Sequence, residues 1–164
     1  MGKNGMWPEK ACNREVKSMG KNREQNKELV KRFPFLMPPH KGSDYDYEYT
    51  LLDDMPPGWR KSFGVQMCEE IAQALYENDC FDKYKIAQIK EKFGELRWYD
   101  FGAPDKVQEI IDKYSRISAK TCISCGKPAT RITLGWIAPY CDDCVRPVYA
   151  ISKCKDIGEA GNLL

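Results

Sequence analysis

Apolar side chains recur at every fourth position in the middle of the chain, which predicts an amphipathic helix. The repeat consists of Trp59, Phe63, Met67, Ile71 and Leu75. A spacing of four places such side chains on one face of a helix, where they can be buried together. We expect the helix to follow a turn at Pro56, Pro57 and Gly58 and to end near Asn78.

Two further helices follow from the same kind of spacing. Pro104 suits the first turn of a helix. The apolar residues that follow it stand three and four positions apart and are Val107, Ile110, Ile111, Tyr114 and Ile117. Residues 22–33 predict a shorter helix with Leu29, Val30 and Phe33 as its apolar edge. The prolines after it end this helix, because proline lacks a backbone donor.

Residues 84–101 predict a β-hairpin with its turn near Gly94. On the first strand, one face is expected to carry Ala87, Ile89 and Phe93. The alternative is a helix over residues 85–93, since Lys and Glu are abundant there. We favour the hairpin.

Tyrosines alternate with acidic residues in a short stretch that we name the acidic–tyrosine segment. It consists of Asp44, Tyr45, Asp46, Tyr47, Glu48 and Tyr49. A period of two predicts a strand with the tyrosines on one face and the carboxylates on the other. The segment is either an edge strand with its tyrosines packed inward or a partner-binding surface that faces a basic groove.

The formal net charge of +2 is too small to predict nucleic-acid binding by itself, but it is unevenly distributed. Residues 1–33 carry nine basic against four acidic side chains, and residues 34–58 carry one against five. The basic side chains of residues 1–33 are Lys3, Lys10, Arg14, Lys17, Lys21, Arg23, Lys27, Lys31 and Arg32. They form either a solvated surface or a phosphate-binding arm.

Eight cysteines are present in a chain without a secretory signal or an apolar run of the roughly 18 residues that would span a membrane. We therefore expect a cytoplasmic protein, where a reducing environment favours metal binding over disulfides. The cysteines expected to be inert are Cys12, Cys68, Cys80 and Cys154.

The other four cysteines form two Cys-x-x-Cys pairs separated by fifteen residues. They are Cys122, Cys125, Cys141 and Cys144. Two tight turns that each deliver two sulfurs to one ion are typical of a zinc ribbon, and Gly126 allows the first turn. Four thiolates close the coordination shell, so we predict one structural zinc. A thioredoxin-like redox site or an iron–sulfur cluster fits this spacing less well.

The sequence offers no enzyme signature. Its single histidine, His40, stands between prolines and Lys41, and no Gly-rich phosphate-binding loop of the Walker or dinucleotide type is present. A Cys–His or Ser–His–Asp site would therefore have one candidate base and no supporting pattern. We expect a protein that is not an enzyme.

Three stretches together resemble a known group of proteins. They are PPGWRKSFGVQMCEEI (56–71), YKIAQIKEKFGELRWYDFG (84–102) and the cysteine pairs of TCISCG … YCDDC (121–144). The combination resembles small zinc-ribbon proteins of unknown function that are encoded by bacteriophages and prophages, mostly of Gram-positive bacteria. The resemblance covers residues 33–145 and transfers no site residues except the four cysteines.

The resemblance implies a non-catalytic phage protein in the host bacterial cytoplasm. Small phage proteins without enzyme motifs include anti-CRISPR inhibitors, which block nucleic-acid loading of a CRISPR effector nuclease. The expected partner is therefore a host protein or ribonucleoprotein, with such a nuclease as the leading candidate. The alternative is a zinc-ribbon nucleic-acid-binding regulatory protein that uses residues 1–33 and the ribbon.

The whole pattern predicts an α+β fold with helices, a β-hairpin and a C-terminal zinc ribbon. Three parts are expected along the chain. Residues 1–33 form a mobile basic arm and a short helix, residues 34–118 an α+β core, and residues 119–164 the ribbon with a C-terminal helix.

Overall fold

The computed structural model describes residues 23–39, 42, 44–147 and 150–160. The chain divides into two compact units, Met1–Thr50 and Leu51–Leu164. The fold is mixed, with helices and small antiparallel sheets, as the α+β prediction requires. None of the helices in the described residues is long and apolar enough to cross a membrane.

The first unit contains the short helix predicted before the prolines, over residues 23–32. It is followed by the 3-10 helix η2 (Pro34–Leu36). Leu29 and Phe33 are buried, as expected of the apolar edge of the helix. Asn26 is buried with them, and its side-chain amide donates a hydrogen bond of 2.9 Å to the carbonyl oxygen of Tyr47.

The acidic–tyrosine segment is not a strand, so that prediction is wrong. A carboxylate oxygen of Asp46 accepts a hydrogen bond of 3.2 Å from the backbone N–H of Glu48. This local bond competes with strand pairing. Tyr47 has a φ of 59°, in the left-handed region that interrupts extended backbone. The segment therefore turns, and the ring centroids of Tyr45 and Tyr47 lie 4.5 Å apart.

In the second unit, the predicted four-residue repeat lies on a continuous helical stretch. It begins with α2 (Pro57–Trp59), continues through a π-helical segment η4 (Arg60–Gly64) and ends with α3 (Val65–Glu77). The 3-10 helix η3 (Leu51–Asp54) precedes it. All five apolar residues of the repeat are buried, which confirms the predicted face.

The predicted hairpin is confirmed, and the alternative helix over residues 85–93 is wrong. Strands β1 (Lys85–Lys92) and β2 (Glu95–Phe101) pair in antiparallel register. The predicted face of β1 needs correction, because a bulge between Ile86 and Gln88 shifts the alternation. Ile86 and Ile89 are buried, whereas Ala87 and Phe93 are exposed.

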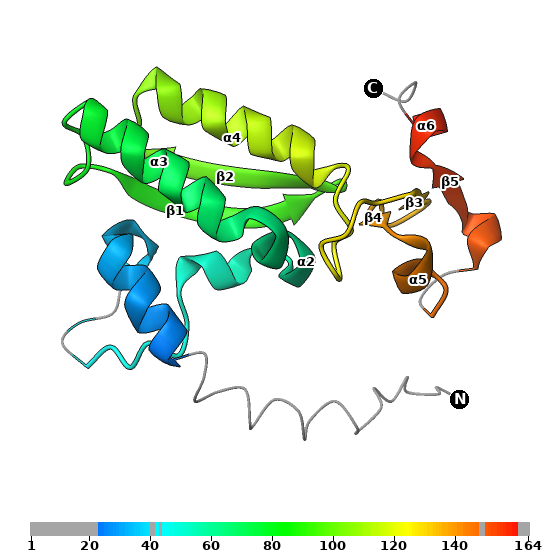
Figure 1. Ribbon diagram of the computed structural model, residues 1–164, viewed down its shortest axis with the longest axis horizontal. Helices are drawn as coiled ribbons and strands as arrows, with labels where there is room; N and C mark the ends of the chain where they lie inside the picture. Colours follow the sequence, from blue (N-terminus) through cyan, green and yellow to red (C-terminus); the bar gives the residue numbers. More distant parts are fainter. Residues whose placement is uncertain (1–22, 40–41, 43, 148–149, 161–164) are drawn as a thin grey trace, which may run out of the picture. The chain divides into compact units, whose positions relative to one another are not determined.

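Helix α4 (Asp105–Ser118) matches the helix predicted to follow Pro104. It contacts both α3 and β2, and the two helices lie over one face of the hairpin (Figure 1). The core between these elements includes Ile71, Leu75, Ile89, Leu96 and Val107. A polar chain leads outward from it: the buried Trp98 Nε1 donates to the hydroxyl of Tyr84, which donates to the half-buried Asp100, each at 2.8 Å.

The C-terminal part contains a small antiparallel sheet in the order β4-β3-β5. Its strands are β3 (Arg131–Thr133), β4 (Pro139–Tyr140) and β5 (Cys154–Asp156). Strands β3 and β4 form a short hairpin between the cysteine pairs, and β5 pairs with the other edge of β3. Short helical segments complete this part, namely α5 (Asp142–Val145), η5 (Ile151–Lys153) and α6 (Ile157–Ala160).

Candidate metal centre

The four cysteines of the two Cys-x-x-Cys pairs meet in space, and we call them the four-cysteine centre. They are Cys122, Cys125, Cys141 and Cys144, and their sulfur atoms all lie within 4.8 Å of one another. The sulfurs of Cys125 and Cys141 are 3.6 Å apart. A tetrahedral zinc with Zn–S bonds of about 2.3 Å requires sulfurs roughly 3.8 Å apart. The donor set and its spacing therefore fit one metal ion.

The first cysteine pair lies on a tight turn that the backbone itself stabilises. The N–H of Cys122 donates to the carbonyl oxygen of Lys127 at 2.8 Å, and the N–H of Gly126 donates to the carbonyl oxygen of Cys122 at 3.0 Å. Gly126 has a φ of +80°, a conformation that glycine adopts without steric cost. The predicted role of Gly126 in this turn is confirmed.

The second pair lies where β4 passes into α5. Cys141 is the residue before α5, and Cys144 lies inside its single turn. The N–H groups of Cys144 and Val145 donate to the carbonyl oxygen of Cys141 at 3.1 and 3.0 Å. This turn directs the sulfurs of Cys141 and Cys144 to the same point as those of the first pair.

Asp142 does not join the centre but fixes α5 to strand β3. Its carboxylate accepts hydrogen bonds from Arg131 Nε at 3.0 Å and from the Thr130 hydroxyl at 2.9 Å. These two bonds and the charge of Arg131 lower the pKa of Asp142. Asp142 therefore stays ionised and paired, and the ion pair orients the second cysteine turn against the small sheet.

The environment of the centre shifts the pKa values of three of its thiols, in opposite directions. Burial alone would raise the pKa of Cys122, but nearby backbone N–H groups of Cys141, Cys125 and Ser124 outweigh it and lower that pKa to about 7. Burial and the neighbouring sulfurs raise the pKa of Cys141 and of Cys144. A divalent cation bound among the four sulfurs would supply the positive charge that ionises them.

The remaining cysteines that the structure describes, Cys68, Cys80 and Cys154, do not belong to the cluster. Cys68 is fully buried, and the sulfur of Cys80 lies 3.1 Å from the carbonyl oxygen of Asn78. Several residues discussed in the sequence analysis lie outside the described part of the chain. They are Cys12, His40 and the basic residues Lys3, Lys10, Arg14, Lys17 and Lys21.

The first cysteine turn is bonded to the beginning of α2, a relationship that the sequence analysis missed. The N–H of Gly58 donates to the carbonyl oxygen of Ile123 at 2.9 Å, and Trp59 Nε1 donates to that of Thr121 at 2.8 Å. A Cβ on Gly58 would lie 2.2 Å from the carbonyl oxygen of Cys122. One on Gly126 would lie 2.5 Å from the carbonyl oxygen of Gly58. The PPGW stretch therefore forms a docking site for the cysteine turn, and its glycine was the available signal.

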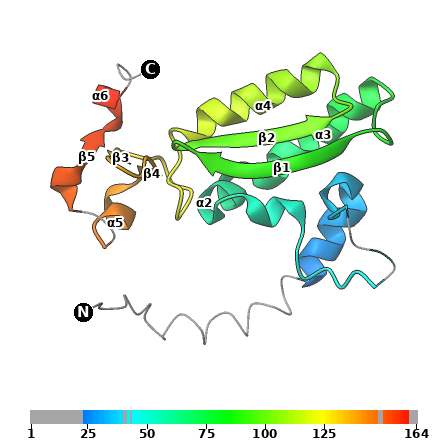
Figure 2. The same ribbon diagram turned by 180° about the vertical axis from the view of Figure 1, so that it is seen from behind.

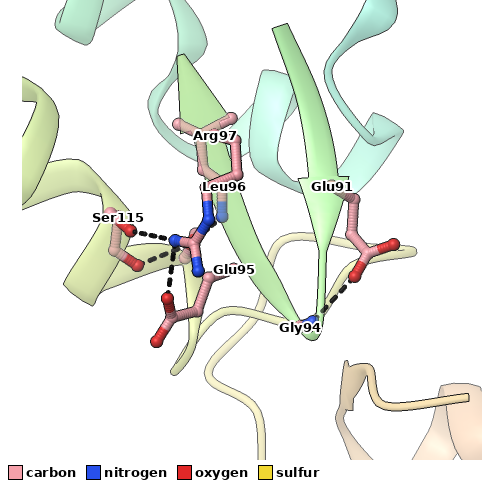
Figure 3. Close-up of polar contacts among 7 residues, drawn as sticks. Glu91, Gly94, Glu95, Leu96, Arg97 and Ser115 are labelled. Atoms are coloured by element: carbon pink, nitrogen blue, oxygen red, sulfur yellow. Dashed lines mark hydrogen bonds and ion pairs between the residues drawn. The ribbon is translucent and has the colours of Figure 1, made fainter. Parts of the chain in front are cut away.

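The tip of the β1–β2 hairpin contacts the same C-terminal part. A Cβ on Gly94 would lie 3.3 Å from a methyl carbon of Ile137 and 3.5 Å from Pro139. The turn at Gly94 is closed by Glu91, whose carboxylate accepts a hydrogen bond of 2.7 Å from the Gly94 N–H (Figure 3). The yellow cysteine turn thus lies close to both α2 and the end of the hairpin (Figure 1).

The residues predicted to bind a partner lie together in the first unit. Glu48 pairs with Arg23, and the hydroxyl of Tyr45 donates to the carbonyl oxygen of Tyr49 at 2.6 Å. Asp44, Asp46 and Glu48 are all exposed. The partner-binding role of the acidic–tyrosine segment stays a prediction.

Comparison with known proteins identifies no family for this chain. No protein-family model, no curated protein and no solved structure matches it. The resemblance to phage-encoded zinc-ribbon proteins therefore stays a prediction.

Proposed function

We propose that the four-cysteine centre binds one structural zinc ion and that the chain is a non-catalytic binding protein stabilised by that ion. The observation that carries the proposal is the set of four sulfurs within 4.8 Å of one another. No histidine or carboxylate of the described residues joins that set. A catalytic zinc usually keeps one position open for water or substrate, whereas four thiolates close the shell.

A groove on the second unit offers no catalytic group of its own, which also supports a non-catalytic role. It lies between α3 and α4 and has a volume of about 550 Å³. Both of its lysines are paired with carboxylates, Lys113 with Glu70 and Lys106 with Glu109, each at 2.7 Å. No serine, threonine, cysteine or histidine lines this groove, and its lysines are held in ion pairs, so it offers no activated nucleophile.

Metal analysis of the protein purified under reducing conditions tests the zinc proposal. We expect about one zinc per chain, and its loss in the Cys122→Ser/Cys125→Ser variant. Cys80→Ser is the matched control, because Cys80 is a free thiol outside the cluster, and it should retain the full zinc content. Absence of metal in the wild-type protein would contradict the proposal.

The partner proposed from the resemblance is a host defence complex, with a CRISPR effector nuclease as the leading candidate. The exposed carboxylates of the acidic–tyrosine segment support a contact with a basic groove of such a complex. The test adds the protein to effectors that carry their guide RNA and measures cleavage of target DNA. Asp44→Lys should relieve the inhibition, since Asp44 is exposed, whereas Asp112→Lys on α4 should not. No effect on any effector type would discard this partner.

A further inference from the structure

The β1–β2 hairpin has a second face, opposite to the one that packs on α3 and α4. Its residues follow from the register, in which Lys85 pairs with Phe101, Gln88 with Tyr99 and Lys90 with Arg97. Residues that are directly opposite in an antiparallel pair point to the same face. In Figure 2 the two strands lie in front of α3, and no element of the second unit crosses them.

Exposed aromatic rings stand on this face. Tyr99 is 46% exposed and Phe101 is 68% exposed, although both rings are large and apolar. Along a strand, side chains two positions apart stand about 7 Å from each other. That distance leaves each ring free to contact a separate flat group.

The face is also basic. Lys90 Nζ lies 5.3 Å from the ring centroid of Tyr99, and Lys92 Nζ lies 5.4 Å from that of Phe93. Arg97 and Glu95 pair with each other at 2.7 Å, and the guanidinium group reaches over the edge of the sheet to Ser115 of α4 (Figure 3). The surplus charge is therefore carried by three lysines. No described residue forms an ion pair with Lys85, Lys90 or Lys92.

The segment that meets the hairpin tip carries a further exposed ring. Phe93 precedes Gly94 at the hairpin tip, and Trp136 precedes Ile137, the residue that Gly94 contacts. Phe93 is 67% exposed and Trp136 is 68% exposed. We name this combined surface the aromatic–basic face. It consists of Lys85, Lys90, Lys92, Phe93, Tyr99, Phe101 and Trp136.

We propose that the aromatic–basic face binds single-stranded nucleic acid. Unpaired bases stack on exposed aromatic rings whatever their identity, and lysines beside the rings neutralise the phosphates between them. A duplex keeps its base faces covered, so it cannot use these rings. A protein partner fits less well, because the centres of protein interfaces are depleted in lysine. The inference rests on the proposed function in one respect: the metal centre orders the segment that carries Trp136.

Fluorescence anisotropy with labelled oligothymidine and oligouridine of about 20 nucleotides tests the proposal on the zinc-loaded full chain. We expect binding at low salt, an affinity that falls as salt rises, and much weaker binding of a duplex. Tyr99→Ala/Phe101→Ala should reduce the affinity at least tenfold, and Lys90→Glu/Lys92→Glu should reduce both the affinity and its salt dependence.

The controls use matched residues on other surfaces. Tyr76→Ala removes an exposed ring from α3, and Lys106→Glu reverses an exposed lysine on α4. Both should bind as the wild type does, and thermal melts should show that all variants fold. Absence of binding by the zinc-loaded wild type would overturn the inference. Equal affinity for a duplex, or unchanged affinity in both face variants, would also overturn it. So would a protein partner that stays bound after nuclease treatment and is lost only in the face variants.

The same samples separate this inference from the proposed function. Zinc content is measured on each preparation before the binding assay. A wild-type protein that contains zinc but binds no oligonucleotide overturns the aromatic–basic face and leaves the metal proposal intact. A wild-type protein that contains no metal overturns the metal proposal, whatever its affinity for the oligonucleotide.

Discussion

The backbone N–H of Gly58 donates a hydrogen bond of 2.9 Å to the carbonyl oxygen of Ile123. This bond joins the beginning of a helix to the turn that carries the first two candidate metal ligands. Trp59, the next residue, is fully buried and bonds to the same turn through its indole N–H. Stability of the helical core and occupancy of the four-cysteine centre should therefore be coupled.

Replacement of Gly58 by alanine tests that coupling. The new Cβ would lie 2.2 Å from one backbone oxygen and 2.7 Å from the next carbonyl group, so the turn must move away. We expect a loss of about 3 kcal/mol or more in unfolding free energy, at the upper end of the cost of overpacking, because backbone cannot yield as a side chain does. Zinc affinity should fall as well. Urea unfolding and competition with a chelator measure the two effects.

Gly64→Ala is the matched control for Gly58→Ala. A Cβ at Gly64 would meet only side-chain atoms, at 3.5 Å or more, in helical backbone. Alanine there should be neutral or stabilise the protein by up to about 1 kcal/mol. If the Gly58→Ala variant were as stable as the Gly64→Ala variant, the backbone at Gly58 would not lie against the cysteine turn as described.

Removal of the metal should loosen the cysteine turn while the β1–β2 hairpin stays folded. In hydrogen exchange, the amides of Gly58, Cys122 and Ile123 should lose protection when a chelator is added, because their bonds depend on the position of the turn. The hydrogen-bonded amides of the β1–β2 ladder should keep their protection. Uniform loss across the chain would instead indicate that the whole unit unfolds without metal.

Ser118 at the end of α4 supplies a buried acceptor to the hairpin. Its hydroxyl accepts a hydrogen bond of 2.8 Å from the backbone N–H of Leu96 and donates one of 2.6 Å to the carbonyl oxygen of Ser115. Ser118→Ala leaves a buried donor unpaired, which should cost about 1–3 kcal/mol. Ser115→Ala removes only a 3.3 Å contact with Arg97 and should change stability by less than about 0.5 kcal/mol. Chemical denaturation of the two variants provides the comparison.

Glu70 should make the free energy of unfolding depend on pH in the acidic range. Burial would raise its pKa, but hydrogen bonds from Lys113 and Tyr114 and the charge of Lys113 outweigh that effect and lower it. The folded pKa thus lies below the ordinary value of about 4.3. The carboxylate stabilises the protein above that value, and this contribution is lost as the pH falls through the folded pKa.

The Glu70→Gln variant isolates this effect. It should be less stable than the wild type at neutral pH, and the difference should shrink between about pH 5 and pH 3. Both proteins carry the same four-cysteine centre, so release of metal by acid cancels in the difference. A difference in unfolding free energy that stays constant across this range would show that Glu70 does not titrate as described.

The spacing of apolar residues was sufficient to predict the helices that bury one face. Trp59, Met67 and Leu75 are apolar at helical spacing, and burial of that face determines both the helix and its orientation. The cysteine pairs were equally informative, because their spacing reflects the geometry of the ligand set rather than long-range packing. The four-cysteine centre was therefore predictable as a group of residues.

Other features depend on contacts that no local pattern encodes. The acidic–tyrosine alternation has the strand period, yet a bond from Glu48 to the Asp46 side chain produces a turn. The bulge at Ile86 changes which residues of β1 are buried, and its position cannot be read from alternation alone. The docking of Gly58 on the cysteine turn likewise joins segments that are distant in sequence.

Trp59 and the carbonyl group of Thr121 to which it bonds are 62 residues apart in the chain. During synthesis, the α2 segment therefore leaves the ribosome long before the turn that covers it. The indole ring of Trp59 stays uncovered until that turn has been made. Under the proposed zinc role, acquisition of the metal is one of the last steps of folding. Zinc shortage should then act on newly made chains, which would aggregate through this uncovered end, while finished molecules keep their metal.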